Sequence, residues 1–95
     1  MKIKKSAQAG SLESCDILIS VEPNKQGSGV EINLDSPAYK QFGQQILEEI
    51  KEIVEKMNIQ DVKIDAIDKG SLSYTIKART ETALLRASES EEDNE

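Results

Sequence analysis

The sequence lacks histidine and tryptophan, and it contains one cysteine and three aromatic residues among 95. Without histidine, no Ser-His or Cys-His nucleophilic pair can form within the chain. The lone Cys15 excludes an intrachain disulfide and the common His/Cys zinc sites. No pair of acidic residues stands on an apolar background that would suit it for general acid–base catalysis. We therefore predict a protein that binds no metal and has no catalytic activity of its own.

Long hydrophobic runs and an excess of basic residues are also missing. No stretch approaches the ~18 consecutive apolar residues of a membrane span. Three lysines near the N-terminus resemble the start of a signal peptide, but no apolar h-region follows them, which predicts a cytoplasmic protein. The formal charge is −6, yet five of the 18 acidic residues lie in residues 88–95, and the remaining 13 are balanced by 12 bases. A near-neutral body gives no basis for nucleic-acid binding.

The length of 95 residues predicts one small domain. Residues 1–15 show no sustained periodicity, so we expect a flexible N-terminal arm there. Residues 16–87 form the predicted α+β domain. Residues 88–95 carry acidic side chains without a base, which favours a solvated, disordered tail.

Alternating apolar and polar residues predict two hairpins. The first joins residues 16–22 and 30–35, with the Gly27-Ser28-Gly29 segment read as its tip rather than as a phosphate-binding loop. The second joins residues 62–66 and 72–78 through a turn at residues 68–70.

Between the hairpins, Ser36 and Pro37 predict a helix start, since serine can cap and proline suits the first turn. An apolar stripe at steps of three and four then continues towards Asn58, where we expect the helix to end. The three aromatic residues lie on apolar stripes and are predicted to be core residues: Tyr39, Phe42 and Tyr74. Thr80 is expected to cap a short C-terminal helix.

The predicted element order is β-β-α-β-β-α. It favours a two-layer α+β sandwich with a four-stranded, mostly antiparallel sheet, one long helix and a short C-terminal helix. The long helix makes the strands on either side of it parallel in direction, while the strand order in the sheet stays open.

Composition and spacing leave the function unresolved, but one set of segments is more informative. GSLESCD at residues 10–16 resembles the N-terminal signature of the citrate lyase acyl carrier protein family, the gamma subunit of that lyase. The resemblance continues through QFG at residues 41–43, KGSL at 69–72 and IKARTETALLRA at 76–87. It spans about residues 1–88.

The resemblance implies a covalent carrier rather than an enzyme. In this family a serine that follows the glutamate of the signature carries 2′-(5″-phosphoribosyl)-3′-dephospho-CoA through a phosphodiester, and that serine corresponds to Ser14. The thiol of the group bears acetyl. The implied partners are the alpha and beta subunits of the lyase and the transferase that attaches the group. The alpha subunit exchanges acetyl for citryl. The beta subunit cleaves the citryl thioester to oxaloacetate and acetyl thioester.

The residues themselves accommodate this role, because esterification requires an exposed hydroxyl on an accessible segment. Alternatives remain: without the family pattern, any of the ten serines has an equal claim, and Ser11 is the rival within the motif. Cys15 stands where the family usually has a second serine, and we read it as a small residue between loop and strand. A carrier of a related complex, such as citramalate lyase, or a non-covalent interaction module would also fit.

Overall fold

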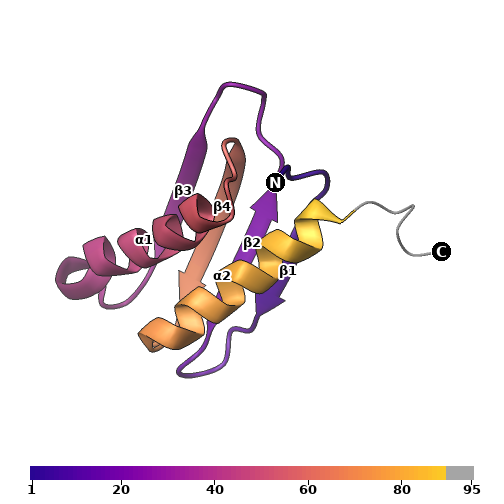
Figure 1. Ribbon diagram of the computed structural model, residues 1–95. Coiled ribbons are helices and arrows are strands. Elements are labelled where there is room, and N and C mark those ends of the chain that lie inside the picture. Colours follow the sequence, from indigo (N-terminus) through magenta and orange to yellow (C-terminus); the bar gives the residue numbers. More distant parts are fainter. Residues whose placement is uncertain (90–95) are drawn as a thin grey trace.

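The computed structural model describes residues 1–89, which form a four-stranded sheet with two helices packed on one face (Figure 1). The elements are β1 (Ala7–Gly10), β2 (Ile17–Glu22), β3 (Val30–Asp35), α1 (Tyr39–Lys56), β4 (Val62–Asp68) and α2 (Ser73–Ser88). The strand order in the sheet is β1-β2-β4-β3. The two-layer α+β class and the four-stranded sheet with two helices are confirmed.

Two of the three strand pairings are antiparallel, which agrees with the predicted mostly antiparallel sheet. β2 pairs antiparallel with β1 and with β4, whereas β3 and β4 are parallel because α1 carries the chain back to the starting end of β3. β4 is therefore a central strand. The alternation of buried and exposed residues along β2 and β4 gives the sheet one apolar face, which the helices cover.

Both predicted hairpins are wrong. β2 and β3 do not pair, because β4 inserts between them along the full length of β2. Residues 73–78 are not a strand but the first part of α2. Their alternation was misleading, because only Ile76 is buried among the apolar residues at positions 72, 74, 76 and 78. The buried positions that follow Ile76 have helical spacing: Thr80, Ala83 and Leu84. The C-terminal helix thus has 16 residues and does not start at Thr80.

The fourth strand of the sheet is β1, which lies within the segment expected to be a flexible arm. Its residue Ala9 is buried, and Ile3 upstream is buried too. The backbone amides of Lys4 and Lys5 both donate to the carbonyl of Ala87 at the end of α2. A four-residue strand rich in alanine gives little periodic signal, which is why the sequence did not reveal it. The loop between β1 and β2 covers only residues 11–16, while residues 90–95 of the expected tail lie outside the described residues.

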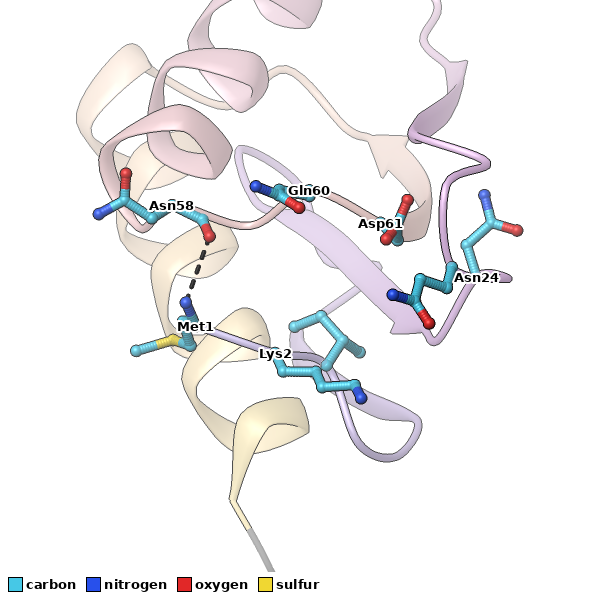
Figure 2. Close-up of a pocket in the computed structure, with 8 residues that line it drawn as sticks. Met1, Lys2, Asn24, Asn58, Gln60 and Asp61 are labelled. Carbon is cyan, nitrogen blue, oxygen red and sulfur yellow. Dashed lines mark hydrogen bonds between the residues drawn. The ribbon is translucent and has the colours of Figure 1, made fainter.

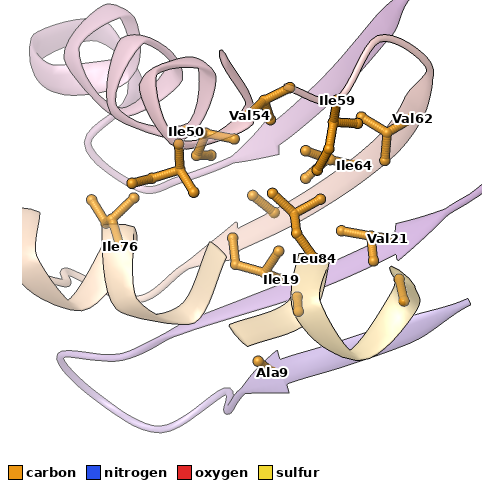
Figure 3. Packing of buried hydrophobic residues seen from close by; sticks show 14 of the residues in the cluster. Ala9, Ile19, Val21, Ile50, Val54, Ile59, Val62, Ile64, Ile76 and Leu84 are labelled. Carbon is orange, nitrogen blue, oxygen red and sulfur yellow. The ribbon is translucent and has the colours of Figure 1, made fainter. Parts of the chain in front are cut away.

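The core consists mainly of branched aliphatic side chains between the sheet and the helices. Figure 3 shows Ile19 and Ile64 of the sheet facing Ile50 of α1 and Leu84 of α2. These four side chains are at most 1% exposed. The interior is therefore filled without any contribution from an aromatic ring.

The aromatic residues predicted to be core residues are exposed instead. Tyr39 is 50% exposed, Phe42 52% and Tyr74 72%. The apolar stripe of α1 is real, but its buried part begins only at Gly43, where the ring of Tyr39 lies against the glycine on the helix surface. Periodicity defines a face of the helix, whereas the contact with the sheet decides how far along that face the core extends.

The start of α1 also differs from the prediction. The helix begins at Tyr39, and its N-cap residue Ala38 makes no side-chain hydrogen bond. The hydroxyl of Ser36 accepts a hydrogen bond from the amide of Ala38 at 3.2 Å and donates one to Asp68 Oδ2 at 2.8 Å. Ser36 thus orders the approach to the helix and ties it to the end of β4. The helix ends at Lys56, and Asn58 follows in the left-handed region, as expected from the sequence.

Candidate functional site

Ser14 lies in the loop between β1 and β2, and the structure leaves it exposed to solvent. The loop occupies one end of the sheet, beside the beginning of α2 (Figure 1). Residues 12–15 are all exposed, whereas the strands on either side are anchored in the sheet. The serine is therefore presented at a projecting turn and does not lie within a strand.

Backbone conformation makes this turn tight. Gly10 has a φ of +95°, and a Cβ at this position would lie 1.8 Å from the carbonyl oxygen of Ile17. Any other residue would clash with the backbone of β2 as well as adopt an unfavourable φ. Cys15, directly after the serine, also lies in the left-handed region with a φ of +65°. The two positions turn the chain before and after Ser14.

The loop is tied to the segment between β4 and α2. The amide of Cys15 donates to the carbonyl of Lys69 at 2.8 Å, and the amide of Lys69 donates to the carbonyl of Asp16 at 2.9 Å. Inside the loop, the amide of Asp16 donates to the carbonyl of Glu13 at 3.2 Å. These bonds fix the peptide groups around Ser14, while the residue itself stays exposed to solvent.

The carboxylate of Asp16 organises the loop from its other side. Its Oδ2 accepts from the hydroxyl of Ser11 at 2.7 Å, and its Oδ1 accepts from the amide of Ile17 at 2.7 Å. Arg79 of α2 donates to both oxygens, at 3.1 and 3.3 Å. The hydroxyl of Ser11, together with the guanidinium and the amide, lowers the pKa of Asp16 to about 2. The loop is thus linked to α2 by an ion pair that stays formed over the neutral pH range.

The two serines of the motif are placed differently. The hydroxyl of Ser11 donates to Asp16 and accepts from the amide of Glu13, so it is engaged in the structure of the loop. Within residues 1–89, the hydroxyl of Ser14 has no such bond, and its residue is the more exposed of the two. An exposed primary alcohol without an internal partner is chemically suited to carry an ester.

A groove lies next to this loop, between the N-terminal half of α1 and the start of α2; we call it the interhelix groove. Its volume is about 340 Å³. Its walls are apolar at Phe42 and Ile46 of α1 and at Leu72 and Ile76 around the start of α2. Phe42 and Leu72 are 52% and 58% exposed, so the groove offers apolar surface to solvent.

Asp68 forms part of the groove and joins the two helix starts. Its Oδ2 accepts from Ser36 before α1, and its Oδ1 accepts from both the amide and the hydroxyl of Ser71 before α2. Burial opposes ionisation of this carboxyl, but the hydrogen bonds from Ser71 and Ser36 outweigh it, and the pKa of Asp68 is lowered. A buried negative charge therefore stands beside the positive ends of both helix dipoles.

A second and larger cavity, of about 530 Å³, lies at the opposite end of the sheet. It is bounded by the N-terminal residues, by Asn24 after β2 and by the segment before β4, as Figure 2 shows. The amino group of Met1 donates to the carbonyl of Asn58 there at 3.2 Å. Because β2 starts beside Ser14 and ends near Asn24, this cavity and the serine loop are at opposite ends of one strand.

Residues 1–89 contain neither a metal-binding cluster nor a membrane-crossing helix. In this part of the chain, no group of three or more histidine, cysteine, aspartate or glutamate side chains is arranged to hold a metal ion. No helix in the same range is both long and apolar enough to cross a bilayer.

Comparison with known proteins identifies relatives along the whole chain. The family described as malonate decarboxylase delta subunit (MdcD), an acyl carrier family, matches residues 4–87. The citrate lyase acyl carrier protein of Halothermothrix orenii is 48% identical over all of this chain and 99% of that protein. The chain belongs to the citrate lyase acyl carrier protein family. The same protein of Latilactobacillus sakei subsp. sakei is 49% identical, covering 90% of this chain and 83% of the relative.

Membership in this family confirms the resemblance carried by the segments at residues 10–16, 41–43, 69–72 and 76–87, and it supports a carrier role. A crystal structure from Thermus thermophilus matches with a TM-score of 0.58 at 17% identity, covering 90% of this chain and 16% of that chain. That likeness shows the fold alone, and our chain spans only about a sixth of that protein's length.

Sequence reasoning missed two parts of the site. Asp16 and Arg79 lie within two of the family-like segments and carry opposite charges, which is the signal that could have paired them. The role of Asp68 could not be found in this way, because the sequence placed it in a hairpin turn that does not exist.

Proposed function

We propose that this chain is the covalent carrier subunit of citrate lyase, with 2′-(5″-phosphoribosyl)-3′-dephospho-CoA attached through a phosphodiester to Ser14. The observation that supports this most directly is the exposed hydroxyl of Ser14, which projects from an anchored loop. Ser11, the rival within the motif, has its hydroxyl engaged with Asp16. The proposal gives the loop a purpose that packing alone does not explain.

The residues around Ser14 suit such an attachment. The hydroxyl is a primary alcohol on the surface, and its neighbours 12, 13 and 15 are exposed as well, so a transferase can approach it. Asp16 and Arg79 hold the base of the loop, and the carbonyl of Lys69 holds the amide of Cys15. The chain therefore presents the serine in one defined geometry while leaving space on its outer side.

When bound, the group supplies a thiol that carries acetyl or citryl as a thioester. The chain itself contributes presentation: it keeps the point of attachment fixed on a rigid body, so that a long arm is concentrated near the sites of the proposed alpha and beta subunits. It contains no histidine, and we propose that the subunits provide the acid–base chemistry. In this proposal the chain is a non-catalytic, cytoplasmic member of a multi-subunit complex.

The attachment is tested by intact mass spectrometry of the chain produced together with the transferase system of a citrate lyase. We expect a gain equal to one prosthetic group for the unaltered chain and for Ser28→Ala, a control at an exposed serine in the loop before β3. Ser14→Ala should remain unmodified. Far-UV circular dichroism should show that all three proteins are folded alike.

Two results would contradict the proposal. A full mass gain in Ser14→Ala would place the attachment elsewhere, and peptide mapping would then identify the residue. No mass gain in the unaltered chain, under conditions in which a citrate lyase carrier from Latilactobacillus sakei is modified, would favour a non-covalent interaction module.

A second candidate is favoured by the family description, which names a malonate decarboxylase subunit. A carrier of that complex, or of citramalate lyase, would have the same attached serine. Co-purification of the modified chain with citrate lyase alpha and beta subunits, and not with malonate decarboxylase subunits, would support the first candidate over the second.

A further inference from the structure

The interhelix groove has apolar walls that nothing in residues 1–89 covers. Phe42 on α1 and Leu72 before α2 are both more than half exposed, while Ile46 and Ile76 below them are buried. Large apolar side chains on both sides of a groove offer a surface whose burial by a ligand would be favourable. The volume of about 340 Å³ is at the lower end of the range for small-molecule sites.

The groove begins next to the attachment loop. Gly70 and Ser71 line it, and Lys69 precedes them directly in the sequence. The carbonyl of Lys69 accepts the hydrogen bond from Cys15, the residue after Ser14. A group esterified to the serine hydroxyl would therefore start only one residue and one hydrogen bond away from the strand–helix connection that lines the groove.

The charges in the groove determine which part of a coenzyme A arm it can bind. Two acidic residues, Glu49 and Asp68, line it, and no lysine or arginine is among its described lining residues. Asp68 already occupies the position where the two helix dipoles would favour an anion, and its lowered pKa keeps it ionised. Phosphate or carboxylate groups would be repelled there. A neutral chain with alkyl and amide groups would not be repelled. Ser73 and Gln45 line the groove and offer polar atoms to such amides.

We propose that the interhelix groove is the resting site of the neutral pantetheine segment of the arm on Ser14, an inference that rests on the proposed function. The alkyl parts of that segment contact Phe42 and Leu72, and the phosphate groups stay outside near the loop. The groove thus shelters the arm between visits to the partner subunits and releases it without breaking a covalent bond.

Weak binding is sufficient for such a site because the ligand is tethered. A flexible arm whose length matches the distance to its binding site gives an effective concentration on the order of 1 mM. A groove with a dissociation constant of about 1 mM for the free segment would then be occupied about half of the time. Tight binding would hinder transfer, so an open groove with two exposed apolar contacts fits the task.

The test compares modified and unmodified protein by NMR, with modification established beforehand by intact mass. The full chain is prepared in a Cys15→Ser background, because Cys15 is its single cysteine and the terminal thiol of the arm then becomes the only one. We expect modification to shift the backbone amide signals of Ile46, Leu72 and Ile76 in addition to those of residues 11–16. Alkylation of the arm thiol by iodoacetamide provides a second, kinetic readout.

A double variant, Phe42→Gln with Leu72→Ser, removes the apolar contacts. Phe42 lies on the exposed side of α1, and Leu72 is the N-cap residue of α2, where serine is a preferred residue, so the variant should keep the fold. The control is Tyr74→Gln. Tyr74 lies on α2 and is 72% exposed, but it does not line the groove. Alkylation should be about two-fold faster in the double variant than in the unaltered modified chain, and unchanged in the control.

The outcomes separate this inference from the proposed function. If the mass shows no modification, the proposed function fails, and the inference fails with it. If modification is complete but the amide shifts stay within residues 11–16 and the alkylation rates are equal, the inference alone is overturned. If the double variant instead loses only its association with the lyase subunits, the groove is a partner-docking surface and not a resting site for the arm.

Discussion

Replacement of Asp16 by asparagine tests whether the loop around Ser14 is held by charge. The carboxylate accepts from Ser11, Ile17 and twice from Arg79, and its side chain is 15% exposed. Asparagine has the same size but carries no charge, and its amide nitrogen would face hydrogen-bond donors. Bonds to a charged acceptor contribute about 1.5–3 kcal/mol each, but solvent screens the Arg79 side chain, which is 44% exposed. We therefore expect the free energy of unfolding to fall by about 1–2 kcal/mol.

The loss should depend on pH in a defined direction. The pKa of Asp16 is about 2 in the fold, below its ordinary value of 3.8, so the ionised form is bound more favourably by the folded state. Its contribution to stability is complete above the ordinary pKa and disappears as the pH falls through the lower one. About half of the difference between the unaltered chain and Asp16→Asn should be gone at pH 3.

Urea unfolding followed by circular dichroism at pH 6 and pH 3 measures both effects. Asp35→Asn serves as the control, because Asp35 is an exposed carboxylate at the end of β3 that makes no side-chain hydrogen bond within residues 1–89. The control should lose little stability at either pH. Equal stability of Asp16→Asn and the unaltered chain at pH 6, or a difference that does not shrink at pH 3, would refute the electrostatic role of Asp16.

Three further changes test other parts of the fold. Gly10→Ala combines a positive φ with a Cβ 1.8 Å from a carbonyl oxygen, and it should lower the free energy of unfolding by about 2 kcal/mol or more; a neutral effect in urea titration would show that the turn can relax. Asp68→Asn should destabilise the fold more at neutral pH than in acid, because the pKa of Asp68 is lowered in the folded state. Thermal unfolding at two pH values measures this effect, and an equal loss of stability at both values would contradict it. Leu84 is fully buried, so Leu84→Ala should lower the free energy of unfolding by about 2–5 kcal/mol. Leu85 lies on the same helix but is 43% exposed, so Leu85→Ala should lower it far less. Similar losses in calorimetry would argue against the described buried face of this helix.

The sequence predicted those elements whose pattern reflects a single physical cause. The alternation around Ile19 arises from one buried and one less buried face of β2, and the strand was found. The helical spacing of Ile46, Ile50 and Ile53 arises from one buried face of α1, and that helix was found as well. The fold class followed from these elements.

The errors arose where tertiary contacts, rather than the local sequence pattern, determine the secondary structure and the strand order. Residues 72–78 alternate by coincidence, since only Ile76 among their apolar positions is buried, and helical packing against β1 and β2 overrides the pattern. Nothing local indicates that β4 inserts between β2 and β3. In the site, the exposed position of the Ser14 loop could be anticipated from its glycine and serines. The attachment of the loop to Arg79 and Lys69 could not, because these residues lie more than 50 positions away from Asp16 and Cys15, which they hold.

This long-range attachment means that the serine acquires its final surroundings late. The residues of β1 and β2 are made early, but the carbonyl that holds Cys15 and the guanidinium that holds Asp16 belong to the last third of the chain. A growing chain on the ribosome therefore displays the GSLESCD peptide in a looser form than the finished protein does. A modifying enzyme that recognises the shape of the turn would distinguish completed carriers from unfinished ones without contacting any other part of the molecule.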